Sequence, residues 1–499
     1  MNPFKRLAGQ TAIYGIPSIL GRFLNYLLVP LYTYGILTSQ EYGVVNVYYS
    51  FTALLLVILT YGMETAFFRF SETETDKQKV YSTGLLSLAI TSSLFLAVTN
   101  SFPQTIARWI DYPQYPEFIR WFTWILVFDV MAAIPFARLR AMNRPMLFAT
   151  IKSINILATV LLNLFFLVFI PWISEHFENS SLNVFLRLLY HPGWTIEYIF
   201  ISNLLASLLT LALLLPQVMH MKWTFDFKLW KRMLRYSIPL LFAGMAGIIN
   251  ETSDRILLRY LLPSGVAESQ VGIYSACYKI AILMVLFIQA YRFAAEPFFF
   301  SQMKKEDARL IYARIMDYFI IAVSLIFLIT MLFLDYVFIY LIGPEFRAAR
   351  NVIPVLMLAK LFLGIYYNLS IWYKVTGKTQ WGAFIMLIGA LVSLGLNFYW
   401  IPKSPDHMIF GYLGSAWATF FSYSLMMVIG YLIGQKYYPV PYNLKKFFGY
   451  ISLAVLLYLI GHWVPAGNLF LGIGFNFLLI GIFAAVVWMI EKPPLSNPR

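Results

Sequence analysis

The 499-residue sequence has few charged residues and almost no cysteine. Charged side chains make up 12% of it, about half the share of roughly 25% in an ordinary soluble domain. Hydrophobic residues make up 60%, and no soluble core can bury so much apolar surface. The single cysteine, Cys277, excludes an intrachain disulfide and argues against a cysteine metal site. We therefore expect the chain to lie in a lipid bilayer.

Acidic residues are also scarce, since 37 lysines and arginines face 23 aspartates and glutamates, for a formal net charge of +14. The basic residues recur in short clusters between apolar runs rather than in one patch, so we expect no nucleic-acid partner. Such clusters encode orientation in a membrane. With both termini cytoplasmic, the opposite side holds only five basic residues: Arg108, Arg187, Arg347, Arg350 and Lys403. We expect a multi-pass protein of the bacterial inner membrane.

Fourteen apolar runs are long enough to span a bilayer, which takes about 20 residues each. We interpret the first run, which follows the basic start MNPFKRLAGQ, as a retained helix rather than a cleaved signal peptide. The predicted class is an all-α polytopic membrane protein with little mass outside the bilayer. The runs are 9–36, 42–67, 80–100, 119–137, 146–171, 195–217, 233–261, 271–293, 311–340, 351–373, 380–401, 409–435, 447–464 and 468–490.

An internal repeat divides the chain. Residues 140–163 align without a gap on residues 374–397, and Tyr-Gly-Val at Gly43 resembles Val-Gly-Ile at Gly272. Repeats in the same orientation require units with an even number of helices, so helices 1–6 match helices 7–12. The predicted domains are a six-helix bundle over 1–220, a second over 221–440, and two further helices with a short tail over 441–499.

Three segments resemble the oligosaccharide flippases of the superfamily that also contains the multidrug and toxin extrusion transporters. They are NYLLVPLYTYGILTSQEYGVVNVYYS from residue 25, IINETSDRILLRYLL with VGIYSACYKI from residue 248, and LNFYWIP with GYLGSAWATFFSYS from residue 396. The resemblance covers about the first 435 residues. It implies two six-helix bundles around a central cavity, and alternating access that moves an undecaprenyl-pyrophosphate-linked glycan across the membrane. We expect no enzyme activity and no cofactor, because the sequence has no insertion large enough for a catalytic domain.

Charged residues inside apolar helices are the sharpest functional signal, because each costs at least about 2.5–3.5 kcal/mol on insertion scales. Arg22 lies near the centre of the first helix, which contains no acid, and Lys279 lies deep in the eighth. A pyrophosphate is a natural counter-charge for both. The alternative is a structural pair with an acid on another helix, such as Glu64, Asp129 or Glu251. Lys152, nearer a helix end, is expected to snorkel to the interface.

The seventh helix carries Glu251, Asp254 and Arg255 on one face. Glu251 and Arg255 can neutralise each other, which leaves Asp254 as a carboxylate without a dedicated partner. Because coupling to an ion gradient recurs in the resembled family, Glu251 and Asp254 are the candidates for coupling to H+ or Na+. A static structural pair remains the alternative.

Asp129 and Lys360 are candidates for a gate. The offset of 234 residues in the repeat maps Lys360 onto Leu126, one turn from Asp129, so the two charges could meet across the cavity. A salt bridge that forms in one state and breaks in the other would gate transport, and a static pair is the alternative.

The candidate substrate-binding residues are Arg22, Asn25, Arg255 and Lys279. The expected partners are a polyprenyl-pyrophosphate-linked glycan and membrane lipid, with no metal site. A multidrug or cation antiporter of the same fold is the main alternative, but it would favour acids in the cavity rather than deep cations. A glycan polymerase or ligase would usually carry a large extracytoplasmic loop, which the sequence lacks.

Overall fold

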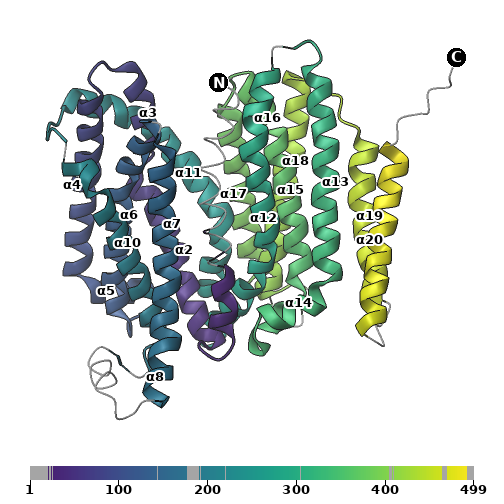
Figure 1. Ribbon diagram of the computed structural model, residues 1–499, viewed down its shortest axis with the longest axis horizontal. Coiled ribbons are helices and arrows are strands. Elements are labelled where there is room, and N and C mark those ends of the chain that lie inside the picture. The colour runs from purple at the N-terminus through teal and green to yellow at the C-terminus, as the bar shows by residue number, and fades with distance from the viewer. Residues whose placement is uncertain are drawn as a thin grey trace. The chain divides into compact units, whose positions relative to one another are not determined.

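The structure is a computed structural model that describes residues 21, 24, 26–142, 144–176, 190–191, 193–219, 221–303, 305–403, 407, 409–463 and 469–491. These residues form helices, turns and loops and no strand (Figure 1). In the first half the helices are α2 (Ser39–Thr60), α3 (Met63–Thr73), α4 (Lys77–Ser101), α5 (Pro103–Trp109), α6 (Pro116–Ala141), α7 (Pro145–Leu164), η1 (Phe165–Phe169), α8 (Ile170–His176), α10 (Ile196–Met219) and α11 (Phe227–Leu261). In the second half they are α12 (Ala267–Gln302), α13 (Ala308–Leu332), α14 (Leu334–Leu341), η2 (Pro344–Ala349), α15 (Val352–Leu369), α16 (Ile371–Val375), α17 (Gln380–Trp400), α18 (Gly411–Tyr437), α19 (Leu444–Trp463) and α20 (Leu469–Glu491).

Thirteen helical segments within the described residues are long and apolar enough to cross a membrane. They match the second to fourteenth predicted runs in order, so the all-α polytopic class is confirmed. The first predicted run, 9–36, lies largely outside the described residues, and the total of fourteen spans stays a prediction. The protein is a multi-pass membrane protein.

Local sequence explains where several helices begin. Prolines occupy the first position of α5, α6 and α7, where the missing N–H is not needed and the fixed φ suits a helix. The N-cap of α2 is Thr38, whose hydroxyl accepts from the backbone N–H of Glu41 while the Glu41 carboxylate accepts from the N–H of Thr38. This reciprocal capping box fixes the start of α2.

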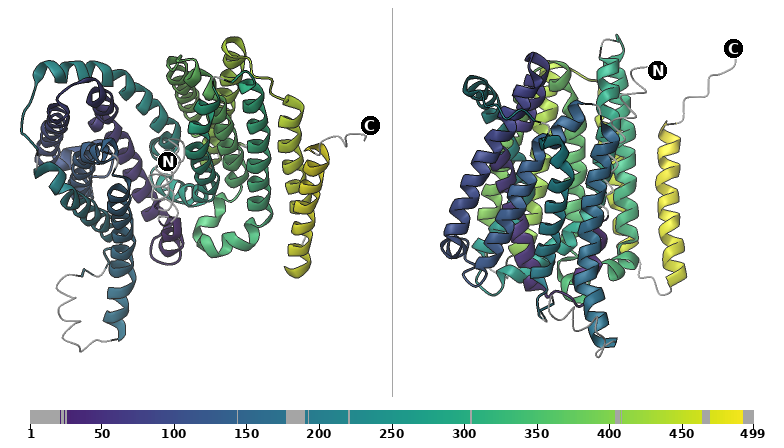
Figure 2. Two further views of the ribbon diagram at one scale, coloured as in Figure 1. Left: turned by 45° about the horizontal axis from the view of Figure 1, so that its top comes forward. Right: turned by 60° about the vertical axis from the view of Figure 1, so that its left-hand side comes forward.

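Two spans contain a local break that apolar length alone does not reveal. Between α2 and α3 the chain passes through Tyr61 and Gly62, whose φ values are 33° and 70°. This left-handed pair ends one helix and starts the next. Between α7 and α8 the π-helix η1 continues the same rod, which Figure 2 shows as one long helix. A π-bulge of this kind inserts an extra residue without ending the helix.

The first compact unit comprises Met1–Ser275. In it α6 packs against α4 and α10, and α11 packs against α2 and α3. A buried cluster around Met63, Leu88, Val130, Ile134 and Met233 joins α3, α4, α6 and α11. Thus α11 is packed with the first unit, although the repeat assigns it to the second bundle. The predicted domain boundaries at 220 and 440 follow the repeat rather than contacts, and they stay a prediction.

The second compact unit comprises Ala276–Arg499, so α12 begins in the first unit and ends in the second. Within it α18 packs against both α15 and α17, and α13 packs against α19. The helices α19 and α20 lie side by side as an antiparallel pair (Figures 1 and 2).

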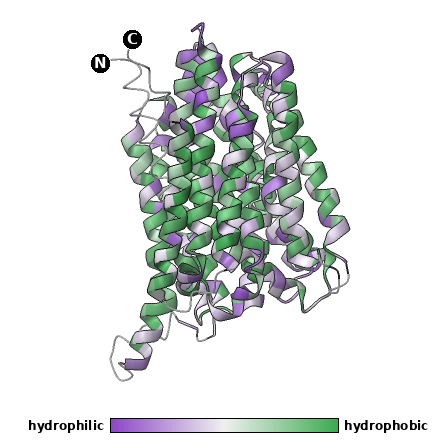
Figure 3. Cartoon of the chain, turned by 90° about the vertical axis from the view of Figure 1, so that its right-hand side faces the viewer, coloured by the Kyte–Doolittle hydropathy of each residue, from purple (hydrophilic) through white to green (hydrophobic). Residues whose placement is uncertain are grey.

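Large apolar side chains are exposed along many spans, as lipid-facing surface requires. On α4, Ile90 and Leu94 are more than 60% exposed, and on α20 so are Phe477 and Trp488. Hydrophobic residues dominate the middle of the helices, and hydrophilic residues gather toward their ends (Figure 3). A helix pairs most of its backbone groups within the segment, which is the condition for exposing these surfaces to hydrocarbon.

Candidate functional site

The repeat-related glycines Gly43 and Gly272 lie at a close crossing of two helices in the first unit. A Cβ atom added to Gly43 would lie 1.9 Å from the backbone oxygen of Glu268, and one added to Gly272 would lie 1.9 Å from that of Ser39. The hydroxyls of Ser39 and Ser269 are 2.8 Å apart at the same place. Only glycine at both positions allows the start of α2 and the start of α12 to approach backbone to backbone.

The charged face of α11 is arranged differently from the sequence prediction. Arg255 pairs with its neighbour Asp254, with 3.2 Å between Nη1 and Oδ1, and the same Nη1 donates to the backbone oxygen of Glu251. The Tyr274 hydroxyl donates to Oδ2 of Asp254 at 2.7 Å. The expectation that Asp254 lacks a dedicated partner is therefore wrong, because a tyrosine on α12 holds it beside Arg255. The side chain of Glu251 is exposed. Its coupling role and that of Asp254 stay predictions.

One turn further along α11, the buried side chain of Arg259 joins the end of α11 to the start of α12 and to a loop that is distant in the sequence. Its guanidinium contacts Oδ2 of Asp111 at 2.8 Å and Oε1 of Glu268 at 3.1 Å, and its Nε donates to the Tyr112 hydroxyl at 3.0 Å. These partners come from the loop before α6 and from the first turn of α12. Arg259 therefore fixes the end of α11 next to the glycine crossing, a role that sequence reasoning missed.

Asp129 on α6 also lies in a polar group of the first unit. The Ser207 hydroxyl of α10 donates to its carboxylate, and the charge of Lys152 acts on it. The ammonium of Lys152 lies 4.3 Å from the centre of the Phe136 ring. The expectation that Lys152 snorkels to the interface stays a prediction. The gating role of Asp129 stays a prediction.

In the second unit, Lys360 of α15 is the deepest of the predicted cations. Its side chain is 1% exposed, and its ammonium lies 4.9 Å from the ring centre of Tyr278 and 5.1 Å from that of Tyr423. A desolvated ammonium is attracted to aromatic faces. Lys279 on α12, adjacent to Tyr278, is half-buried. The substrate role of Lys279 and the gating role of Lys360 stay predictions.

A second charged group of this unit centres on Glu296 of α12. Its carboxylate lies 2.6 Å from the ammonium of Lys374 and 3.4 Å from the guanidinium of Arg292. The Arg292 guanidinium also lies 4.2 Å from the centre of the Tyr367 ring. One carboxylate facing two cations leaves a local excess of positive charge, which suits an anionic ligand.

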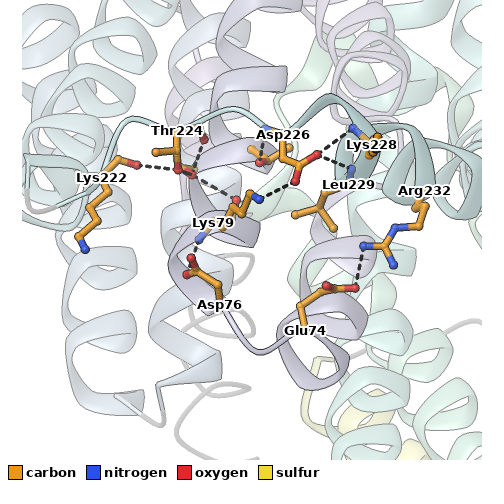
Figure 4. A network of polar contacts seen from close by, with 11 residues as sticks. Glu74, Asp76, Lys79, Lys222, Thr224, Asp226, Lys228, Leu229 and Arg232 are labelled. Carbon is orange, nitrogen blue, oxygen red and sulfur yellow. Dashed lines mark hydrogen bonds and ion pairs between the residues drawn. The ribbon is translucent and has the colours of Figure 1, made fainter.

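A polar network links the loop between α3 and α4 to the loop between α10 and α11 (Figure 4). Lys79 lies 2.6 Å from Asp226, and Arg232 lies 2.9 Å from Glu74. Asp226 also caps α11 by accepting from the N–H groups of Lys228 and Leu229. The hydrogen bond from Lys79 and these backbone N–H groups lower the pKa of the Asp226 carboxyl to about 2. The network ties two loops that sequence reasoning places on the cytoplasmic side.

Arg22 and Asn25, the predicted substrate contacts on the first helix, lie outside the described residues. Their roles stay predictions. Among the described residues, no group of three or more His, Cys, Asp and Glu side chains could hold a metal ion.

Comparison with known proteins decides the family. The sequence pattern of the family described as "Polysaccharide biosynthesis protein" matches residues 7–303, more than half of the chain. The chain belongs to the polysaccharide biosynthesis protein family. Among curated proteins none matches it in sequence. The matched range contains the glycine crossing, the charged face of α11 and the Asp129 group of this family member.

Solved structures share the fold of this polysaccharide biosynthesis protein. The lipid II flippase MurJ, in an inward closed conformation, aligns over 97% of this chain and 99% of its own, with a TM-score of 0.69 and 14% identity. An inward-facing multidrug resistance MATE transporter of the MOP superfamily aligns over 87% and 94%, with a TM-score of 0.59 and 12% identity. A mutant Vibrio cholerae MATE transporter aligns over 87% and 98%, with a TM-score of 0.56 and 14% identity. At these identities the likeness shows the fold alone. The family match confirms the predicted resemblance at the level of a polysaccharide biosynthesis protein, and the solved structures confirm the predicted fold.

Proposed function

We propose that this polysaccharide biosynthesis protein is a flippase. It moves a polyprenyl-pyrophosphate-linked oligosaccharide, the repeat unit of a surface polysaccharide, across the bacterial cytoplasmic membrane by alternating access. The family supports a role in polysaccharide assembly, and the fold is that of transporters. In this proposal both termini are cytoplasmic, and the substrate enters from the cytoplasmic side.

The observation that carries the proposal is the burial of Lys360 in a membrane-spanning helix. A lysine that is 1% exposed at such a depth is costly. The rings of its two tyrosine neighbours attract the ammonium, which lies 4.9 Å and 5.1 Å from their centres. A pyrophosphate would gain from that charge, whereas a cationic drug would be repelled. Lys279 and the pair Arg292 and Lys374 supply further positive charge in the same unit.

The glycine crossing of α2 with α12 supplies a gate for the proposed cycle. Alternating access requires that contacts at one end of the helices form and break. The crossing at Gly43 and Gly272 brings the two helix backbones into close contact. Arg255, Asp254 and Tyr274 lie close by, so binding of H+ or Na+ at Asp254 could loosen α12 from α11.

A deletion strain tests the proposal. Mass spectrometry of its lipids should show a polyprenyl-pyrophosphate-linked oligosaccharide that accumulates, and its surface glycan should be lost. Lys360→Met should fail to restore the glycan. Lys378→Met is the matched control, because Lys378 also stacks on a tyrosine, Tyr437, at 3.8 Å but lies in the turn before α17. A strain that accumulates no such lipid would refute the proposal.

A multidrug or cation antiporter is the second candidate, and the acid group at Asp129 is what favours it. A half-buried carboxylate beside a serine and a lysine could carry a proton against a cationic substrate. The deletion strain separates the candidates, because an antiporter would leave surface glycan intact and make the cells sensitive to cationic dyes.

A further inference from the structure

The second unit contains a cavity that none of the functions above uses. It has a volume of about 490 Å³ and lies where α13 meets α14, beside the ends of α19 and α20. Its polar lining consists of Asp335, Tyr336, Arg350, Tyr458, His462 and Asn476. Ligand cavities typically measure about 300–1,000 Å³, so this one can hold a small polar group.

The cavity contains charges of both signs. Asp335 and Arg350 form an ion pair, yet the Asp335 side chain is 59% exposed and that of Arg350 is 42% exposed. A guanidinium has five donors and a carboxylate about four acceptor sites, so each retains capacity for a ligand. His462 adds another nitrogen donor or acceptor at the rim. The site can therefore bind an anionic group at Arg350 next to a cationic group at Asp335.

The inner wall of the cavity is fixed by packing. Asn476 is 6% exposed, and its amide donates to the backbone oxygen of Leu332 at 2.7 Å, which ties α20 to the end of α13. Gly461 faces the same wall, and a Cβ atom there would lie 2.4 Å from the side chain of Leu332. The inner wall is thus tied to the end of α13, and the outer charged pair is partly exposed.

The rim of the cavity is strongly apolar. Trp463, Phe470 and Leu471 are between 73% and 81% exposed at the adjoining ends of α19 and α20. A tryptophan at a helix end is typical of the membrane interface, and the exposed Phe470 and Leu471 suit contact with lipid chains. The occupant must therefore be an amphiphile, with a polar head in the cavity and apolar chains along α20. The charge distribution of the sequence assigns this end to the extracytoplasmic leaflet.

We propose that the cavity binds the headgroup of a phospholipid that carries a primary amine next to its phosphate, as phosphatidylethanolamine does. The ammonium donates to Asp335, while Arg350 and His462 bind the phosphate. A purely anionic headgroup would face the Asp335 carboxylate, and a quaternary ammonium has no N–H to donate to it. The lipid would hold the pair α19 and α20 against α13. This inference does not depend on the transported substrate.

Titration of single lipids into the detergent-purified full chain, read by native mass spectrometry, tests the inference. The probes are phosphatidylethanolamine, phosphatidylcholine and phosphatidylglycerol. The wild-type chain should prefer phosphatidylethanolamine, and Asp335→Asn should bind it roughly tenfold more weakly, because a charge-assisted hydrogen bond is lost. The variant should bind phosphatidylcholine as the wild type does.

Two further variants keep the test decisive. Glu491→Gln removes the partner of Lys446 at the other end of α19 and α20, and it should leave the lipid preference unchanged. His462→Gln should weaken phosphatidylethanolamine and phosphatidylglycerol equally. Three results would overturn the inference. These are unchanged preference in Asp335→Asn, tighter binding of phosphatidylglycerol than of phosphatidylethanolamine by the wild type, and displacement of the bound lipid by a polyprenyl phosphate.

Discussion

Replacement of Gly43 by alanine should separate α2 from α12. The added Cβ atom would lie 1.9 Å from the Glu268 backbone oxygen, whereas carbon and oxygen atoms in contact lie about 3.3 Å apart or more. The two backbones must therefore part locally by roughly 1.4 Å, because no side chain can swing away. Overpacking of this kind typically costs about 1–3 kcal/mol. In Gly43→Ala this cost weakens the contact between α2 and α12.

A disulfide reports the separation. Ser39 and Ser269 have hydroxyls 2.8 Å apart, so cysteines at both positions should crosslink in a Cys277→Ala background, which contains no other cysteine. Oxidation followed by maleimide labelling should show nearly complete crosslinking in the parent and much less with Gly43→Ala. Thermal unfolding in detergent should shift down in parallel.

The control for this substitution is Gly395→Ala on α17, where a Cβ atom would meet nothing within 4 Å. That variant should crosslink like the parent and be as stable or slightly more so, by up to about 1 kcal/mol, because alanine favours a helix over glycine. If Gly43→Ala crosslinks and melts like the parent, the close crossing does not exist in the protein.

Three other outcomes are expected. Asp226 has a lowered pKa in the folded chain. Its contribution to stability is therefore present above about pH 4 and is lost as the pH falls toward about 2. In Asp226→Asn, the free energy of unfolding should change less with pH over that range. Arg259→Leu should lower the free energy of unfolding by about 3 kcal/mol, since it leaves the half-buried Glu268 and the buried Tyr112 hydroxyl without this guanidinium, and Arg259→Lys should lose less. A reporter fused at Arg144 should give a cytoplasmic signal, and a periplasmic signal would reverse the assigned orientation.

The helical spans were predictable because each must satisfy one local requirement, an apolar run about as long as the bilayer is thick. Thirteen described spans match predicted runs for that reason. The breaks inside spans were not predictable in the same way. Tyr61 adopts a left-handed conformation that non-glycine residues rarely take, and the π-helix after Leu164 has no proline to mark it.

The sequence predicted several of the charged residues of the candidate site, but not which residues they pair with. Spacing along α11 favoured a pair between Glu251 and Arg255, because residues four apart share a helix face. Arg255 instead pairs with Asp254, since Tyr274 from α12 holds that carboxylate. The Arg259 group was missed because two of its partners, Asp111 and Tyr112, come from a loop that is distant in the sequence. The repeat gave a usable signal, since the matched Gly43 and Gly272 meet at one crossing.

Transport by the purified chain tests the central claim most directly. The full chain is reconstituted into vesicles with a labelled polyprenyl-pyrophosphate-linked oligosaccharide, and the fraction of label exposed on the outer face is followed with time. Wild type and Lys378→Met should move the lipid, whereas Lys360→Met should be slower by at least about tenfold, which corresponds to roughly 1.4 kcal/mol. If wild-type vesicles move the glycan lipid no faster than empty vesicles, the chain is not its flippase.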